Sequence, residues 1–129
     1  MMNFVVTDDN HDRLNDFAQL LLSIFPGSVL YLYADPVEVI GHLRDHQTDA
    51  VFIEAAMEKM EGTQLIFEMR EKKYELPAFI LADSDEYEDN AMHNDAIGYL
   101  IRPISEDELR NAVWSALEKS SESGALEQH

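Results

Sequence analysis

Short runs of apolar residues alternate along the chain with segments in which apolar residues recur every three or four positions. The first pattern is typical of buried β-strands and the second of amphipathic helices. The predicted strands are residues 3–7, 28–34, 49–54, 76–82 and 98–101. The predicted helices are Leu14 to Ile24, 35 to about 46, a segment from Gly62, about 85–94, and a segment from Ser105.

Polar residues mark the start of two of these helices. Asp35 can accept a hydrogen bond at the N-cap, Pro36 suits the first helical position and Glu38 can reach back to the cap. Ser105 and Glu108 make a second capping box. Five strand–helix units in this order predict an α/β fold, with a five-stranded parallel sheet and helices on both faces.

Composition is that of one ordinary domain. The chain has 129 residues, of which 46% are hydrophobic, and this is enough to bury a core. From Lys119 the residues become small and polar. We therefore predict one domain over residues 1–118 and a disordered tail or the start of a linker over residues 119–129.

The formal net charge of −17 changes the expected partners. A surface this acidic repels phosphate backbones and anionic lipids, so we expect neither direct nucleic-acid binding by this domain nor membrane binding. Solubility explains the charge more simply than an acidic docking face does. Cysteine is absent and the N-terminal residues do not resemble a signal peptide, which fits a cytoplasmic location.

The candidate chemistry lies at the carboxyl ends of the predicted strands. Asp8 and Asp9 follow the first strand, Glu54 ends the third, Ala82 ends the fourth and Arg102 follows the fifth. Because parallel strands end at one edge of the sheet, we expect three carboxylates and one guanidinium to converge there.

These residues carry a resemblance to the receiver domains of bacterial response regulators over about residues 3–118. The resemblance rests on an acidic pair, a methionine-containing loop ending in glycine, and an aromatic residue followed by a basic residue and proline: Asp8, Asp9, Met57, Met60, Gly62, Tyr99, Arg102 and Pro103. Residues 85–87, 99–100 and 103–106 are most similar to receivers of the LytTR group. The resemblance implies the flavodoxin-like (βα)5 topology and a role in two-component signal transduction and transcription regulation.

Three positions depart from the receiver pattern. Glu54 replaces the phosphoacceptor aspartate, Ala82 the threonine or serine, and Arg102 the lysine. Glutamate is longer than aspartate by one C–C bond, about 1.5 Å, so its carboxylate extends toward the space of a phosphoryl group. Alanine has no hydroxyl to draw Tyr99 inward. We expect an ion pair from Arg102 to Glu54, or to Asp8 or Asp9.

The leading hypothesis is therefore an atypical receiver, a pseudo-receiver that is not phosphorylated at the usual position and is not an enzyme. It would act through protein–protein interaction or dimerisation. The alternatives are a receiver that uses Asp8 or Asp9 as its phosphoacceptor with Mg²⁺, and a flavodoxin-like cofactor binder. The last is the weakest, because no glycine-rich phosphate loop follows the first strand.

The metal ligands implied by the resemblance are Asp8, Asp9 and Glu54. Their mutual repulsion favours a cation, but the longer Glu54 disturbs the octahedral geometry that Mg²⁺ demands, and Arg102 competes for the same carboxylates. We expect weak or absent Mg²⁺ binding and no required cofactor. His42 and His46 have helical spacing for a metal, but no third ligand is evident, so we expect two exposed histidines.

The resemblance also implies protein partners: a histidine kinase, an output domain or a second copy of the chain. Receivers pair through the fourth helix, fifth strand and fifth helix. Tyr99, Leu100 and Trp114 could mark such a homodimer face, because Trp114 lies outside the inner stripe of the last helix. The alternative, that Trp114 lies flat on its own domain, stays open.

Overall fold

The computed structural model describes the backbone of residues 1–127 and the side chains through residue 119. Strands and helices alternate as predicted, in the order β1 (Asn3–Thr7), α1 (His11–Ile24), β2 (Val29–Tyr33), α2 (Val37–Asp45), β3 (Ala50–Glu54), α3 (Gly62–Glu71), β4 (Ala78–Ala82), α4 (Glu88–His93), β5 (Gly98–Ile101) and α5 (Glu106–Glu127).

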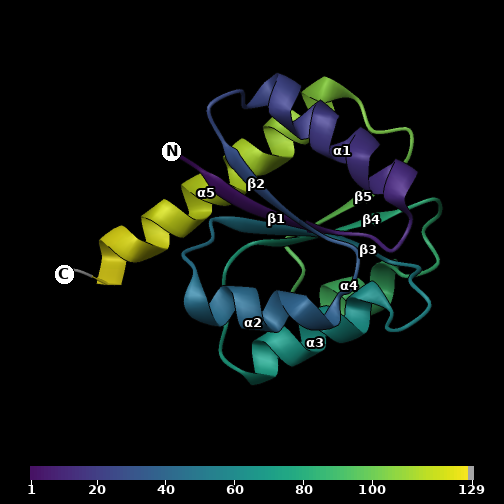
Figure 1. Cartoon of the computed structure of the whole chain (residues 1–129). Coiled ribbons are helices and arrows are strands. Elements are labelled where there is room, and N and C mark those ends of the chain that lie inside the picture. The colour runs from purple at the N-terminus through teal and green to yellow at the C-terminus, as the bar shows by residue number, and fades with distance from the viewer. Residues whose placement is uncertain (128–129) are drawn as a thin grey trace.

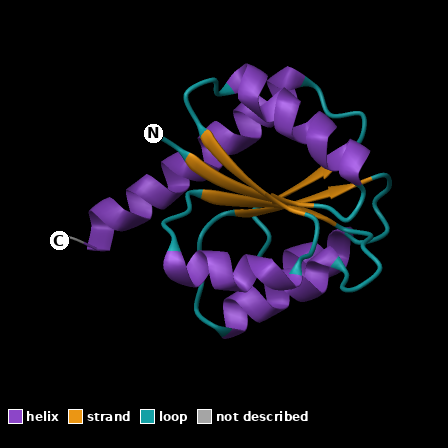
Figure 2. Ribbon diagram, viewed as in Figure 1, coloured by secondary structure: helices purple, strands orange, loops and turns teal. Residues whose placement is uncertain are grey.

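The five strands form one parallel sheet in the order β2-β1-β3-β4-β5. Helices α1 and α5 cover one face, and α2, α3 and α4 cover the other (Figure 1). The arrows in Figure 2 all point toward the same edge of the sheet, where the loops after β1, β3, β4 and β5 meet. The predicted α/β architecture is confirmed, and this shared edge places the candidate residues together.

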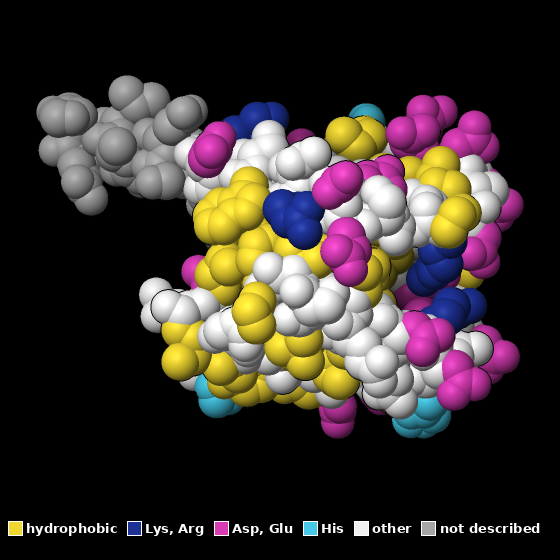
Figure 3. Space-filling view, turned by 90° about the horizontal axis from the view of Figure 1, so that it is seen from above, with side chains coloured by type: hydrophobic (Ala, Val, Ile, Leu, Met, Phe, Trp, Pro, Cys, Tyr) yellow, Lys and Arg dark blue, Asp and Glu magenta, His cyan; other side chains and the backbone are white. Residues whose placement is uncertain are grey.

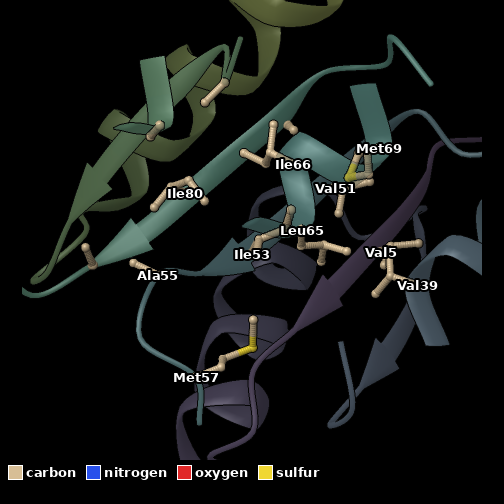
Figure 4. Packing of buried hydrophobic residues seen from close by; sticks show 14 of the residues in the cluster. Val5, Val39, Val51, Ile53, Ala55, Met57, Leu65, Ile66, Met69 and Ile80 are labelled. Atoms are coloured by element: carbon tan, nitrogen blue, oxygen red, sulfur yellow. The ribbon is translucent and has the colours of Figure 1, made fainter. Parts of the chain in front are cut away.

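Two buried clusters, one on each face of the sheet, explain why β3 and β4 are apolar without interruption. Val51 and Ile53 face α2 and α3, in the cluster shown in Figure 4. Phe52 faces the other way, toward α1 and α5, and its ring stacks on Phe79. Because both faces are covered, every residue of β3 and β4 is buried.

Glycine is required at the start of α3. A Cβ atom at Gly62 would collide with the backbone carbonyl oxygen of Glu54 and would lie 2.9 Å from Cγ2 of Ile53. The Gly62 N–H donates to the carbonyl oxygen of Ala55 at 2.9 Å. The close approach of α3 to the end of β3 therefore fixes the loop that follows Glu54.

Helix starts follow the sequence, with differences of one or two residues. The Oγ of Ser105 accepts from the N–H of Glu108 at 3.1 Å, as predicted. The carboxylate of Asp35 accepts from the N–H of Val37 at 3.0 Å, although α2 begins only at Val37. The first helix is capped by Asn10, whose side chain accepts from the N–H of Arg13 at 3.0 Å.

Two helices differ in length from the prediction. Helix α4 has six residues and is shorter than the predicted 85–94 segment, and only Ala91 of it is buried. Helix α5 continues through the predicted boundary at Lys119 to Glu127. The expected disordered tail is helix over residues 119–127, and residues 128–129 lie outside the described part.

No helix among the described residues is both long and apolar enough to cross a membrane.

Candidate functional site

The site lies at the sheet edge where β1 and β3, neighbours in the sheet, both end. Asp8 follows β1 with 2% of its surface exposed, and Glu54 ends β3 with 1% exposed. Arg102 follows β5, and its N–H donates to the carbonyl oxygen of Ala82 at 2.9 Å. The parallel topology brings these residues together as the sequence predicts.

Glu54 and Arg102 form the predicted ion pair. A guanidinium Nη2 of Arg102 donates to Oε2 of Glu54. The same Nη2 lies 3.9 Å from Oδ2 of Asp8, and Nη1 donates to the exposed Asp83 at 3.2 Å. Arg102 therefore bridges the ends of β1, β3 and β4 from its place after β5.

A second arginine, which sequence reasoning missed, holds Asp8. Arg13 lies in the first turn of α1, and its Nε and Nη2 donate to the two carboxylate oxygens of Asp8, each at 2.8 Å. The N–H of Asn10 also donates to Oδ1 of Asp8 at 2.9 Å. The signal for Arg13 was its position five residues after Asp8, on a helix that starts beside the strand end.

Asp9 shares Arg13 with the other two acids, at 3.9 Å from Nη2 to Oδ1, and its second oxygen fixes a loop. Its Oδ2 accepts from the N–H of Glu58 at 2.8 Å. Lys59 in the same loop pairs with Asp35 at 2.8 Å. The β3–α3 loop, residues 55–61, is thus tied to the loops that follow β1 and β2. It lies beside the ion-pair cluster of Asp8, Glu54, Arg13 and Arg102, which is called the pocket below, in distinction from the surface pocket next to it.

Burial and pairing act on Glu54 in opposite directions. Burial raises the pKa of Glu54, while the hydrogen bond and charge of Arg102, and then the charge of Arg13, lower it; the net pKa is raised. The hydrogen bond to Asp8 raises the pKa of Arg13. Both guanidiniums remain charged at neutral pH, so the pocket holds two buried acids and two permanent cations.

A surface pocket lies beside this cluster. Arg13 and Arg102 line a surface pocket of about 530 Å³ whose other walls are Asp16, Phe17, Leu20, Pro103 and Ile104. Figure 3 looks down on the face covered by α1 and α5, and shows acidic and basic side chains gathered toward the right-hand edge of the molecule, where the strands end.

Ala82 and Tyr99, at the positions of the receiver threonine or serine and of the receiver aromatic residue, lie on the α4 side of the edge. Ala82 is buried at the end of β4. The hydroxyl of Tyr99 donates to the carbonyl oxygen of Ser84 at 2.6 Å and accepts from the N–H of Tyr87 at 3.3 Å. Tyr99 is therefore held by the β4–α4 loop, through groups that do not depend on the side chain at position 82.

The expected contact face needs a correction at Leu100. Leu100 is buried beneath α1 and α5, with 4% of its surface exposed, so it does not share an exposed face with Tyr99. Trp114 is 49% exposed, and its ring packs edge-on against Phe25 at 5.8 Å between centroids. Trp114 both rests on its own domain and leaves half its surface open.

The expectation for His42 was also wrong. His42 is buried, its Nδ1 lies 2.6 Å from the hydroxyl of Tyr33, and its ring packs against Tyr31 and His46. Burial lowers its pKa. Only His46 is exposed as expected. The two aromatic side chains of β2 cover this part of α2, which the helical spacing of the histidines does not reveal.

Comparison with known proteins identifies the family. The family model of the response regulator receiver domain matches residues 4–114. The chain belongs to the response regulator receiver domain family. Receiver domains are signalling modules of two-component systems that interact with histidine kinases and output domains.

Curated relatives and solved structures agree with this assignment. An uncharacterized response regulatory protein of Vibrio cholerae is 30% identical over 107 residues, which cover 81% of this chain and 41% of that protein. Another, from Vibrio vulnificus, is 26% identical over 129 residues, which cover all of this chain and 52% of that protein. The chain therefore spans about half the length of the curated relatives it matches.

The fold is similar to that of solved receivers. A receiver domain protein of Clostridium thermocellum is 21% identical with a TM-score of 0.82, and the match covers 94% of this chain and 98% of that one. A response regulator of Thermotoga maritima, solved in complex with Mg²⁺ and BeF, is 20% identical with a TM-score of 0.80; the match covers 91% of this chain and all of that one. These likenesses confirm the flavodoxin-like receiver fold.

Receiver domains typically use Mg²⁺ for phosphorylation, but the residues of this receiver do not fit the ion. Both oxygens of Asp8 accept from Arg13, Oε2 of Glu54 accepts from Arg102, and Oδ2 of Asp9 accepts from the β3–α3 loop. Within the described part of the chain, no group of three His, Cys, Asp or Glu side chains is arranged to hold a metal ion. Each of the three carboxylates therefore already accepts a hydrogen bond from another group of the protein.

Proposed function

We propose that this chain is an atypical receiver domain that is not phosphorylated at the usual position and that acts through protein–protein interaction or dimerisation. The ion pair between the buried Glu54 and the partly exposed Arg102 carries this proposal. Arg102 holds the Glu54 carboxylate where a phosphorylated receiver would hold a transient phosphoryl group. The contact is a fixed one, because both partners are part of the chain.

Three features support the loss of phosphorylation. The longer side chain of Glu54 moves its carboxylate by about 1.5 Å relative to an aspartate, away from the position that in-line attack requires. Ala82 offers no hydroxyl to a phosphoryl group. The hydroxyl of Tyr99 is already engaged with Ser84, so its position does not wait for a phosphoryl signal.

The alternative acceptors are less well supported. Asp8 is buried and both of its oxygens accept from Arg13, which lowers the nucleophilicity of the carboxylate. Asp9 is exposed, but one of its oxygens holds the β3–α3 loop. Asp9 is therefore the better of the two alternative acceptors. A flavodoxin-like cofactor binder has no further support beyond the shared topology.

The wider role follows from the family and stays part of the proposal. We place this receiver in the cytoplasm, with a histidine kinase, an output domain or a second copy as partner, and without direct nucleic-acid binding by this domain. The similarity to LytTR-type regulators would make transcription the output. Tyr99 and Trp114 remain the residues of the proposed homodimer face; Leu100 is buried and is removed from it.

Intact-mass spectrometry after incubation with Mg²⁺ and acetyl phosphate tests the proposal. The wild-type chain should gain no phosphoryl group, while the Thermotoga maritima receiver, which binds Mg²⁺ and BeF, serves as the positive control. A stoichiometric adduct would contradict the proposal. Peptide mapping would then show whether Glu54, Asp8 or Asp9 carries the phosphoryl group.

Ultracentrifugation tests the interaction part separately. If Trp114 contributes to a homodimer, Trp114→Ala should shift the mass toward the monomer while the fold is retained. Leu22→Ala is a matched control, because Leu22 is also an exposed large apolar residue, but on α1. The same mass for wild type and Trp114→Ala would remove Trp114 from the proposed interface.

A further inference from the structure

One nitrogen atom of Arg13 is the common neighbour of all three acids. Its Nη2 lies 2.8 Å from Oδ1 of Asp8, 3.9 Å from Oδ1 of Asp9 and 3.9 Å from Oε1 of Glu54. These are the carboxylates that the receiver family implies as metal ligands. A positively charged group of the protein therefore lies at the point toward which they converge.

This guanidinium is built into the fold. The Asn10 cap begins α1 beside the end of β1, so that Arg13 in the first turn faces Asp8. Its contact with Asp8 is bidentate, the geometry in which guanidinium and carboxylate bind each other best. The Arg13 side chain is only 31% exposed, and Arg13 also lines the neighbouring surface pocket.

A divalent ion and this guanidinium exclude each other. Mg²⁺ needs ligand oxygens at about 2.0–2.1 Å in octahedral geometry, and it usually keeps several of its waters. The Nη2 and Nε groups of Arg13 fill the space next to the oxygens of Asp8, and their charge removes the repulsion among the acids that would otherwise favour an ion.

We propose that Arg13 is an internal cation that takes the place of the divalent metal, so that the wild-type pocket excludes Mg²⁺ and removal of Arg13 uncovers a divalent metal site at Asp8 and Glu54. The inference deepens the proposed function, on which it rests, because it gives a second reason why the pocket is closed to phosphoryl chemistry. It makes Arg13 a specificity-determining residue for the ion.

Titration with Mn²⁺, followed by electron paramagnetic resonance, tests the inference on the full chain. Arg13→Ala should bind Mn²⁺ about tenfold or more tightly than wild type, because a unit charge within about 4 Å of the ligands is removed. Arg110→Ala is the matched control: it removes the same charge from an exposed pair with Asp107 on α5 and should bind like wild type.

Two further variants keep the test decisive. Arg13→Gln retains a side chain of intermediate length without the charge, and it replaces Arg13→Ala if that variant does not fold. Asp8→Asn in the Arg13→Ala background should abolish the gained Mn²⁺ binding. Tight Mn²⁺ binding by wild type, or equal binding by wild type and folded Arg13 variants, would overturn the inference.

The outcomes separate this inference from the proposed function. If Arg13→Ala gains no metal site while wild type still takes no phosphoryl group, only the role of Arg13 is wrong. A phosphoryl adduct on wild type would contradict the proposed function itself. A second readout is phosphorylation of the triple variant Glu54→Asp, Ala82→Thr and Arg102→Lys. The triple variant should take up a phosphoryl group only when Arg13→Ala is added, because Mg²⁺ can then bind.

Discussion

The two sides of the functional edge are held in different ways. On the pocket side, Asp8 and Glu54 are almost fully buried, and each is paired with an arginine. On the α4 side, one tyrosine hydroxyl bonds to the loop after β4, and the six-residue helix α4 buries only Ala91. The pocket is fixed by charge, whereas the α4 side is held by neutral contacts near the surface.

This difference indicates where the domain can still respond. Loss of one partner from a buried ion pair costs about 3–5 kcal/mol, whereas a neutral hydrogen bond contributes about 0.5–1.5 kcal/mol. Truncation of a side chain should therefore cost more stability on the pocket side than on the α4 side. We expect a partner that binds near α4 to change this domain more easily than chemistry in the pocket does.

The largest loss of stability should come from replacing Arg102. Arg102→Met leaves Glu54 buried without its main partner and should lower the free energy of unfolding by about 3 kcal/mol in urea titration. Arg110→Met, which breaks an exposed pair, should cost less than about 0.5 kcal/mol. The double variant Glu54→Met with Arg102→Met should recover much of the stability that Arg102→Met loses. Equal losses of stability in Arg102→Met and Arg110→Met would contradict a pocket fixed by the Glu54–Arg102 pair.

The next largest loss of stability should come from a change at Gly62, which fixes the β3–α3 loop. Gly62→Ala should lower the free energy of unfolding by about 2 kcal/mol, because the new methyl group collides with the Glu54 carbonyl oxygen. Gly41→Ala in α2 meets open space, apart from Arg44 at 4.0 Å, and should be neutral or stabilising. A stable Gly62→Ala variant would show that the β3–α3 loop is not tightly constrained.

A smaller effect is expected on the α4 side. Tyr99→Phe removes the hydrogen bond to Ser84 and should cost about 1 kcal/mol. Amide hydrogen exchange should accelerate in α4 and leave the β3 amides unchanged. Tyr31→Phe is the control, since the Tyr31 hydroxyl makes no hydrogen bond within the described residues. Equal acceleration in β3 would argue that the two sides are not independent.

The smallest effect concerns pH. Burial raises the pKa of Glu54 above its ordinary value in spite of Arg102 and Arg13. The contribution of Glu54 to stability is therefore full below its unfolded-state pKa and is lost as the pH rises through the raised folded-state pKa. Carboxyl-carbon NMR titration should show this shift and a further rise in Arg102→Met. Asp35 should show a pKa shift of the opposite sign, because the hydrogen bond from Lys59 lowers its pKa.

The strand ends were predictable because parallel topology alone brings them to one edge. The Glu54–Arg102 pair followed from that placement and from the charges of the two residues. Arg13 was not predicted, because its contact depends on where α1 starts and on Asn10 as its cap. Sequence reasoning therefore found one of the two arginines that close the pocket.

The errors at Leu100 and His42 also have local causes. Successive residues of a strand face opposite sides of the sheet, so Tyr99 and Leu100 cannot share a contact face. His42 was expected to be exposed because helical spacing alone gave it no partner. Its burial depends on Tyr31 and Tyr33 of β2, which lie against α2 in the fold.

The most direct test of the closed pocket is a ¹⁵N–¹H NMR spectrum of the wild-type chain, recorded with and without Mg²⁺ and beryllofluoride. If Arg13 and Arg102 already satisfy the carboxylates, the amide signals of Asp9, Ala55, Ala56 and Asp83 should not move. Saturable shifts of these signals would show that the pocket accepts the metal and the phosphoryl analogue, and would contradict the account.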